Sequence, residues 1–426
     1  MRSRRLMSAS VLSLAVVACA LLCSSAAAQS FQVIYNFQNS PDGAQPVAGV
    51  TFDHQGNLYG TTQRGGVLQC ILSGCGTVFE LVPSSGGGWT EQVLTQFVAQ
   101  NYYGGVPQTP VVLDRLGNVY GTFVCTFDCF AGHGGGVFQL LHSNGLWRDQ
   151  TVASYWGQGQ DQCEPCGVAF DPTGRLYGVT TTFESQYGDT GAVFYLGQQS
   201  VFGWYTVILY VFHGGLDGVN PSTWFTFDSS GAIYGTTEYG TDNNAGSVFK
   251  LQNAGGAQWD ETQLWDFHGG TVDGANPTLG VIFDSAGNLY GTTSEGGTGS
   301  KGTVFKLTHN ANGSWTESIL YSFQGGSDAS TPSGPLTFDA QGNLYGVASG
   351  GAHGYGAVYK LTPSGGGQWT ESVVYSFTDG LDGGYPSGEL ALDSSGNLYG
   401  TAAQGGAYPN CSDEPNCGGV VYEISP

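Results

Sequence analysis

The sequence predicts an all-β fold, a seven-bladed β-propeller with four-stranded blades. One motif recurs seven times at a nearly constant spacing, each repeat holds four strand-like runs, and the two ends of the repeat region complement each other. The composition agrees. With 71 Gly, 23 Tyr, 23 Phe and 9 Trp but only 10% charged residues, it is typical of short strands joined by tight turns.

The repeat is centred on Asp-x-x-Gly-Asn-Leu-Tyr-Gly. Its spacing shortens gradually along the chain without being broken, and an unbroken period of this length indicates a propeller or a solenoid. We interpret the recurring aspartate as a turn residue, because a catalytic site seldom needs seven copies. The seven aspartates are Asp53, Asp114, Asp171, Asp228, Asp284, Asp339 and Asp393.

The sixth repeat shows the four expected strands of a blade, at 335–339, 343–348, 357–361 and 369–377. Four short strands per repeat are the unit of a propeller. Between the first two, Asp339-Ala340-Gln341-Gly342 suits a type I turn closed by a left-handed glycine.

The ends of the repeat region predict how the ring closes. Residues 31–37 resemble the fourth strand of a repeat, and residues 420–424 resemble the third. The N-terminal strand is therefore expected to complete the seventh blade, which removes exposed sheet edges. We predict one propeller domain over residues 29–426.

Residues 1–28 read as a secretory signal peptide. Arg2, Arg4 and Arg5 precede an apolar run over 11–23, and small residues lead to a cleavage site after Ala28. A lipoprotein signal ending at Cys19 is the alternative. Nothing later is apolar enough to span a membrane. We expect an exported protein, in the periplasm or the extracellular medium, and a monomer by default.

The predicted mature chain is strongly acidic. Removing the three signal arginines from the 11 basic residues leaves 8 against 33 Asp and Glu. Such a surface repels nucleic acid and anionic membranes.

Three segments of the fifth repeat carry a family resemblance: Asp-Ser-Ala-Gly-Asn-Leu-Tyr-Gly-Thr-Thr (284–293), Gly-Thr-Val-Phe-Lys-Leu (302–307) and Trp-Thr-Glu-Ser-Ile-Leu-Tyr-Ser-Phe (315–323). They resemble the GloVer tandem repeats of secreted bacterial proteins, over the whole predicted mature chain. The resemblance implies a propeller-like fold and assigns no activity or catalytic residues. Relatives that carry a C-terminal surface anchor differ from this chain, which ends at Pro426.

The two faces of the predicted ring differ. The Asp-x-x-Gly turns and the turns between third and fourth strands form one face, the turn face. The longer loops between second and third strands, and the crossings between blades, form the opposite crossing face. All the cysteines after the signal peptide fall in loops of the crossing face: Cys70, Cys75, Cys125, Cys129, Cys163, Cys166, Cys411 and Cys417.

An even cysteine count in an exported chain predicts disulfides, with four local pairs expected from their spacing. Pairing between neighbouring blades is an alternative, as are a zinc site built from Cys125, Cys129, Cys163 and Cys166, or a redox role for Cys163 and Cys166. We predict no metal site.

The cysteine loops gather on blades seven, one, two and the crossing into three, where the repeat is also irregular. We predict a binding region there, because recognition concentrates on loops held by a rigid scaffold. Its candidate contacts are Arg64, Tyr102, Tyr103 and Trp156.

The regular crossings place Asp before Gly at Asp42, Asp217, Asp273 and Asp382. Turn capping is the ordinary role for such residues. The alternative is a ring of carboxylates near the channel mouth that binds a ligand or Ca²⁺. His213 and His268 occupy equivalent crossings, where a shared metal competes with two solvated histidines.

The sequence contains no Gly-x-Ser-x-Gly elbow, His-Glu-x-x-His or P-loop. The leading hypothesis is a secreted binding module for a glycan or a cell-surface protein. The second is a carbohydrate-active hydrolase or lyase with carboxylates at the channel mouth, and the third is a structural envelope or matrix component. A carboxylate pair beside an aromatic pocket would favour the enzyme, and its absence the binder.

Overall fold

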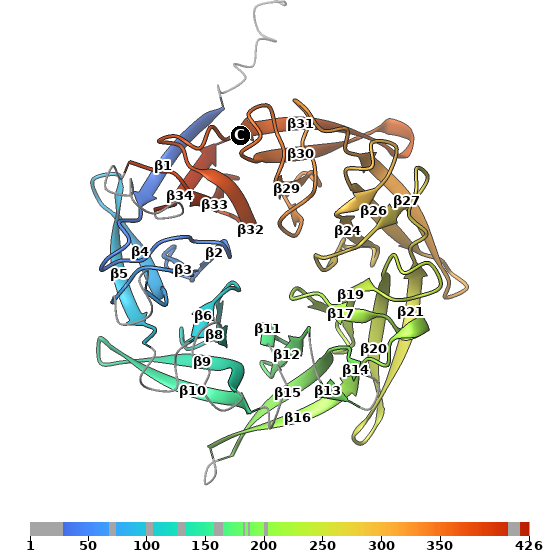
Figure 1. Cartoon of the computed structure of the whole chain (residues 1–426), viewed down its shortest axis with the longest axis horizontal. Coiled ribbons are helices and arrows are strands. Elements are labelled where there is room, and N and C mark those ends of the chain that lie inside the picture. The colour runs from blue at the N-terminus through green and yellow to red at the C-terminus, as the bar shows by residue number, and fades with distance from the viewer. Residues whose placement is uncertain are drawn as a thin grey trace, which may run out of the picture.

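A computed structural model describes residues 29–67, 74–98, 105–125, 133–156, 165–181, 184–185, 188–199, 203–407 and 418–425. Seven antiparallel sheets stand around a central channel like the blades of a fan (Figure 1). The predicted seven-bladed propeller is confirmed.

Each blade runs from an inner first strand to an outer fourth strand. Blade one contains β2 (Val50–Phe52), β3 (Leu58–Thr62), β4 (Thr77–Ser84) and β5 (Gly88–Gln96). Blade two contains β6 (Gly105–Pro107) with β7 (Val112–Leu113), then β8 (Val119–Cys125), β9 (His133–Ser143) and β10 (Leu146–Trp156). Blade three contains β11 (Pro165–Phe170), β12 (Leu176–Thr180), β15 (Ala192–Gln199) and β16 (Gly203–Val211), with a side hairpin of β13 (Glu184–Ser185) and β14 (Gly188–Asp189).

The remaining blades repeat this order. Blade four contains β17 (Val219–Pro221) with β18 (Thr226–Phe227), then β19 (Ile233–Tyr239), β20 (Ser247–Gly255) and β21 (Gln258–Asp266); blade five contains β23 (Ile282–Phe283), β24 (Leu289–Thr293), β26 (Thr303–His309) and β27 (Trp315–Ser322), beside the pair β22 (Gly274–Ala275) and β25 (Glu295–Gly296); blade six contains β28 (Thr337–Phe338), β29 (Leu344–Ala348), β30 (Ala357–Ser364) and β31 (Gln368–Ser376); blade seven contains β32 (Gly384–Leu392), β33 (Leu398–Gln404), β34 (Val420–Ser425) and β1 (Ser30–Asn36). Two short 3₁₀ turns lie at Gly215–Asp217 and Gly365–Gly367.

The inner strand of blade six is shorter than the sequence predicted, spanning Thr337–Phe338 rather than 335–339. Pro335 precedes it and has no backbone N–H to donate to the ladder. The other three strands lie where the pattern placed them.

The Asp-x-x-Gly turns close as expected from their residues. The carboxylate of Asp339 accepts hydrogen bonds from the backbone N–H groups of Gln341 and Asn343, at 2.9 and 2.8 Å. Gly342 has φ of 83°, a conformation that glycine adopts without steric cost. The recurring aspartate is thus a turn residue.

Adjacent blades pack through aromatic pairs. The phenylalanine that follows a fourth strand meets the third-strand ring of the next blade, as in Phe267 with Phe305 at 5.0 Å and Phe323 with Tyr359 at 5.0 Å. The glycine of Leu-Tyr-Gly leaves room for that ring: a Cβ on Gly291 would lie 2.5 Å from Phe305. The repeated Gly and Phe therefore serve the same blade interface.

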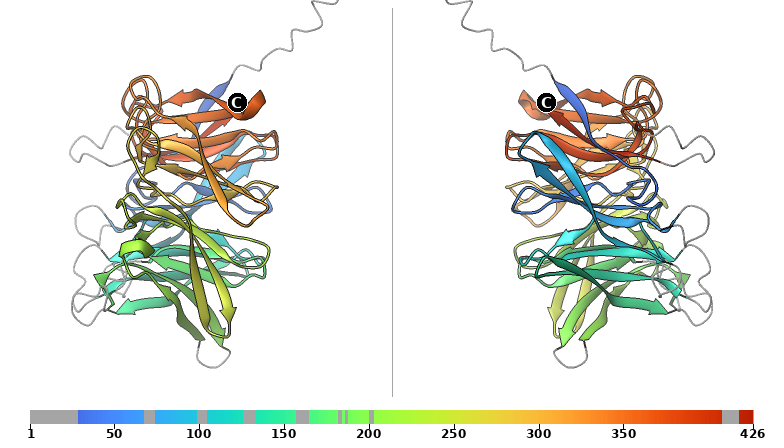
Figure 2. Two further views of the ribbon diagram at one scale, coloured as in Figure 1. Left: turned by 90° about the vertical axis from the view of Figure 1, so that its right-hand side faces the viewer. Right: turned by 90° about the vertical axis from the view of Figure 1, so that its left-hand side faces the viewer.

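The ring closes as predicted. β1 pairs antiparallel with β34, from Ser30 opposite Ser425 to Asn36 opposite Val420, and Figure 2 shows it alongside the C-terminal strands. Because strands alternate in direction, all Asp-x-x-Gly turns lie on one face of the ring and the crossings on the other. No helix in the part of the chain that the structure describes is long and apolar enough to cross a membrane.

Candidate functional site

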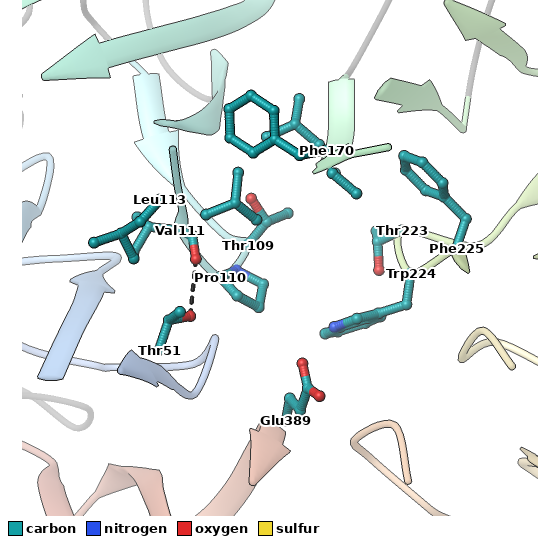
Figure 3. A pocket seen from close by; sticks show the side chains of 14 residues that line it. Thr51, Thr109, Pro110, Val111, Leu113, Phe170, Thr223, Trp224, Phe225 and Glu389 are labelled. Atoms are coloured by element: carbon teal, nitrogen blue, oxygen red, sulfur yellow. Dashed lines mark hydrogen bonds between the residues drawn. The ribbon is translucent and has the colours of Figure 1, made fainter. Parts of the chain in front are cut away.

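The central channel contains a cavity of about 390 Å³ on the side of blades one to four and seven. Its walls come from the inner strands and the residues beside them, which Figure 3 shows converging on one space. The Thr51 hydroxyl donates to the Val111 carbonyl at 2.8 Å and joins the walls of blades one and two. The described lining residues are Thr51, Thr109–Leu113, Gly167–Phe170, Thr223–Phe225 and Glu389.

Two of these residues break the repeat at one position, four residues before the recurring aspartate. Blade four has Trp224 there and blade seven has Glu389, whereas the other five blades have glycine or proline: Gly49, Pro110, Gly167, Gly280 and Pro335. The position lies on the channel wall. The side chains of Trp224 and Glu389 therefore extend into a space that the glycine or proline of the other blades leaves open (Figure 3).

The glycines at this position are required by the closeness of neighbouring blades. A Cβ on Gly280 would lie 2.1 Å from the Trp224 carbonyl oxygen, and one on Gly49 would lie 2.4 Å from that of Glu389. Gly49 and Glu389 also form a parallel bridge. The backbones that carry Trp224 and Glu389 are thus fixed by direct contact, which holds the site rigid.

Glu389 is the only acid among the described residues that line the cavity. Its side chain is open to the channel, and the surrounding blades reduce its solvation. This loss of solvation raises its pKa to about 7. Glu389 can therefore be ionised or neutral under physiological conditions, and it can exchange hydrogen bonds with a ligand.

Trp224 and Thr223 add polar atoms with unmet hydrogen-bonding capacity. The Trp224 Nε1 and the Thr223 Oγ1 are shielded from solvent and have no hydrogen-bond partner among the described residues. Burying a polar atom without a partner costs free energy. The rings of Trp224, Phe170 and Phe225 make the cavity wall aromatic, and Glu389 adds a polar group to it.

The crossing aspartates named from the sequence do not line this cavity. Their carboxylates are bonded within their own crossings: Asp42 to the Tyr35 hydroxyl and the Gln38 N–H, Asp217 to the Tyr210 hydroxyl and the His213 N–H, Asp273 to the N–H groups of His268 and Gly274, and Asp382 to the Tyr375 hydroxyl and the Thr378 N–H. These bonds are turn caps. A ligand or Ca²⁺ role for the same residues stays a prediction.

The two crossing histidines each face their own aspartate. His213 Nδ1 lies 2.9 Å from Asp217 and His268 Nδ1 lies 3.3 Å from Asp273. Across the described residues, no group of three or more His, Cys, Asp or Glu side chains is placed to hold a metal ion.

Most of the predicted binding region lies outside the described residues, including Tyr102 and Tyr103. Trp156 ends β10, with only its backbone described. Arg64 exchanges backbone hydrogen bonds with Ala44 beside the crossing into blade one. Because Tyr102 and Tyr103 lie outside the described residues and only the backbone of Trp156 is described, the region stays a prediction.

Among the cysteines, Cys75 is buried and disulfide-bonded. Cys125 lies in β8 and Cys166 in β11, with only their backbones described. The other five lie outside the described residues: Cys70, Cys129, Cys163, Cys411 and Cys417.

Sequence reasoning missed Trp224 and Glu389, although a signal for them was present. Both residues depart from the repeat at the channel wall rather than in the loops: Glu389 lies on β32, and Trp224 lies just before β18. Aligning the repeats position by position would have isolated them.

Solved structures share the fold at low identity. An ancestral GH74 enzyme is 10% identical with a TM-score of 0.54, over 89% of this chain and 48% of that one. A glucose dehydrogenase is 12% identical (TM-score 0.43; 79% and 100% covered), and a puromycin-hydrolysing peptidase of Mycobacterium tuberculosis is 10% identical (0.48; 87% and 52%). At this identity, the likeness to the GH74 enzyme shows the propeller fold alone.

No curated protein matches the sequence. The model of the Gloeobacter/Verrucomicrobia repeat matches residues 124–349 and 260–426, which together span more than half of the chain. The predicted family is confirmed: the chain belongs to the Gloeobacter/Verrucomicrobia repeat family.

Proposed function

We propose that this protein is an exported, non-enzymatic binding module that holds a sugar ring in its central channel. The observation that carries the proposal is the pairing of Trp224 with Glu389 across one cavity, at a position where the other blades have glycine or proline. An indole face stacks on the apolar face of a sugar ring, and a carboxylate accepts hydrogen bonds from its hydroxyl groups.

The size of the cavity supports a small ligand. At about 390 Å³ it falls near the lower end of ligand sites, which span roughly 300–1,000 Å³. A purely structural protein has no need of such a cavity.

The carboxylate count favours binding over hydrolysis. Glycosidases generally act with two carboxyl groups on either side of the scissile bond, one as acid and one as base or nucleophile. Glu389 has no second carboxylate with it among the described residues that line the cavity. One carboxylate of raised pKa fits reversible recognition better than this two-residue chemistry.

A glycan array tests the proposal when it is scored both for binding and for release of sugar products. Trp224→Ala should weaken binding by at least ~5-fold, because aromatic anchors carry about 1 kcal/mol or more. Trp224→Phe should keep part of the affinity. Pro335→Ala is the matched control, since Pro335 occupies the same repeat position in blade six but does not line the cavity.

We expect bound glycans to be recovered intact. Product release that disappears in Glu389→Gln would instead establish an enzyme. Glycan binding that is indifferent to both Trp224 and Glu389 would place the site elsewhere, with the predicted loop region as the next candidate.

A further inference from the structure

Two further hollows adjoin the channel cavity on the turn face. One, of about 400 Å³, lies over blades one and two, and the other, of about 290 Å³, lies over blades two and three. Leu113 lines all three spaces, Thr51 also lines the first hollow, and Phe170 also lines the second. The channel cavity and the two hollows thus adjoin one another at Leu113.

We propose that the channel cavity and the adjoining hollow over blades one and two together bind an oligosaccharide of two or more rings. The inner ring lies in the channel against Trp224, and a further ring lies in the hollow over blades one and two, which we call the outer subsite. The inference rests on the proposed function and adds the length of the ligand and the path that it takes.

The outer subsite is lined by a rigid aromatic ring. His142 stacks on Trp147, with ring centroids 4.5 Å apart and planes 16° from parallel. Its backbone N–H donates to the Asn118 side chain at 3.2 Å. A ring held in this way loses little entropy when a ligand arrives, and its ring nitrogens can bond to sugar hydroxyl groups.

The acids around the outer subsite are already engaged within the protein. Asp53 accepts from Gln55, Asn57 and the Tyr59 hydroxyl, and Glu80 accepts from the same hydroxyl at 2.7 Å. Asp114 is bonded in the same way inside the blade-two turn. These carboxylates are therefore poorly placed to select a cation.

The exposed side chains there include hydrogen-bond donors beside the apolar Leu116. Arg115 is exposed at the blade-two turn and lines both hollows. One of its guanidinium nitrogens donates to the Pro172 carbonyl at 3.4 Å, and its remaining N–H groups can reach a ligand. His54 is exposed on the opposite wall. Donors beside a flat ring suit the oxygen-rich edge of a sugar.

The repeat supplies a matched control. His309 in blade five has the same environment as His142: its backbone N–H donates to Asn288 at 3.3 Å, and its ring lies 4.7 Å from that of Trp315. It differs in lying over blade five, away from the hollows of blades one to three.

The experiment measures the affinity of labelled oligosaccharides of one to six rings, cut from the glycan that binds most strongly on the array. For the wild-type protein, affinity should rise about 10-fold or more between one ring and four. His142→Ala and Arg115→Ala should each weaken the tetrasaccharide by about 5–10-fold, as expected for one lost contact of ~1 kcal/mol. Both should leave the monosaccharide unchanged.

His309→Ala should bind both probes normally. A monosaccharide that binds as tightly as the tetrasaccharide, or an equal effect of His142→Ala on both, would overturn the outer subsite and leave the channel site standing. An array with no binder sensitive to Trp224 would overturn the proposed function and this inference together.

Discussion

At the scale of single residues, each repeat contains one position that builds the turn and another, four residues earlier, that faces the channel. The turn aspartate is present in all seven blades because each turn needs its carboxylate. The channel position four residues earlier needs only a small residue where blades approach closely. The turn therefore does not require Trp224 or Glu389 at this position. Binding of a ligand in the channel would account for both residues.

The raised pKa of Glu389 predicts pH-dependent binding. Only the ionised carboxylate accepts hydrogen bonds through both oxygens, so affinity should increase as the pH rises through about 7. Between pH 5 and pH 8 the gain should be about 10-fold or more, because hydrogen bonds to charged groups contribute roughly 1.5–3 kcal/mol. Titration calorimetry across this range measures it.

With a monosaccharide, which does not reach the outer subsite, Glu389→Gln should bind with little dependence on pH, whereas Trp224→Phe should bind more weakly but keep the wild-type slope. Glu389 is the only titratable side chain among the described lining residues of the cavity. A wild-type affinity that does not change between pH 5 and pH 8 would remove Glu389 from the contact.

At the scale of elements, a glutamate on the outer strand and an aspartate in a nearby crossing form an acid pair that recurs in several blades. Glu91, Glu261, Glu317 and Glu371 lie on the outer strands of blades one, four, five and six. Loss of solvation, followed by a nearby crossing aspartate, raises the pKa of each to about 7. Oε1 of Glu317, for example, is buried without a described partner.

The raised pKa values of these four glutamates predict that the folded state is less stable above neutral pH. The folded pKa of about 7 exceeds the ordinary value of 4.5, so the folded state binds the proton more tightly than the unfolded chain. The corresponding stability is complete below about pH 4.5 and is lost as the pH rises through about 7. Changing all four to Gln should raise the Tm by several degrees at pH 8 and hardly at pH 4.

Calorimetry on the fourfold variant checks the sign, and the exposed Glu295→Gln is the matched control. A variant that melts lower than the wild type at pH 8 would show that the glutamates are stabilising when ionised.

The cysteine loops give a further prediction at this scale. We expect no free thiols in the exported protein and four local bridges, because each partner lies within six residues in the sequence. Each bridge closes a small loop and should contribute about 2 kcal/mol on the chain-entropy model. Peptide mapping without reduction identifies the pairs. Bridges from Cys125 or Cys129 to Cys163 or Cys166 would contradict the local scheme, and four titratable thiols with bound zinc would contradict the oxidised framework.

At the scale of the whole molecule, the sequence predicts what depends on local spacing. The blade count, the Asp-x-x-Gly turns and the closing strand all follow from the repeat, because each rests on short-range chemistry such as Asp339 with Gly342. The channel site could not be predicted in this way. Trp224 and Glu389 lie 165 residues apart in sequence and share a cavity only after the ring closes. The binding region predicted on the crossing face rests on loops that lie mostly outside the described residues, so it stays a prediction beside the channel site.

Ring closure through β1 is the last prediction. Phe31 stacks on Tyr375 of blade six at 3.9 Å, and Phe37 packs against Phe79 of blade one at 5.0 Å, so β1 connects blade seven to both neighbours. Deleting residues 31–37 should expose the edge of β34, lower the Tm sharply and promote association.

Phe37→Ala should cost about 3–5 kcal/mol of folding free energy, as for other buried phenylalanines. Val272→Ala, at a side chain that is 83% exposed, should cost almost nothing. Thermal melts and sedimentation velocity measure both effects. A truncated protein that remains monomeric with an unchanged Tm would show that the ring closes without this strand.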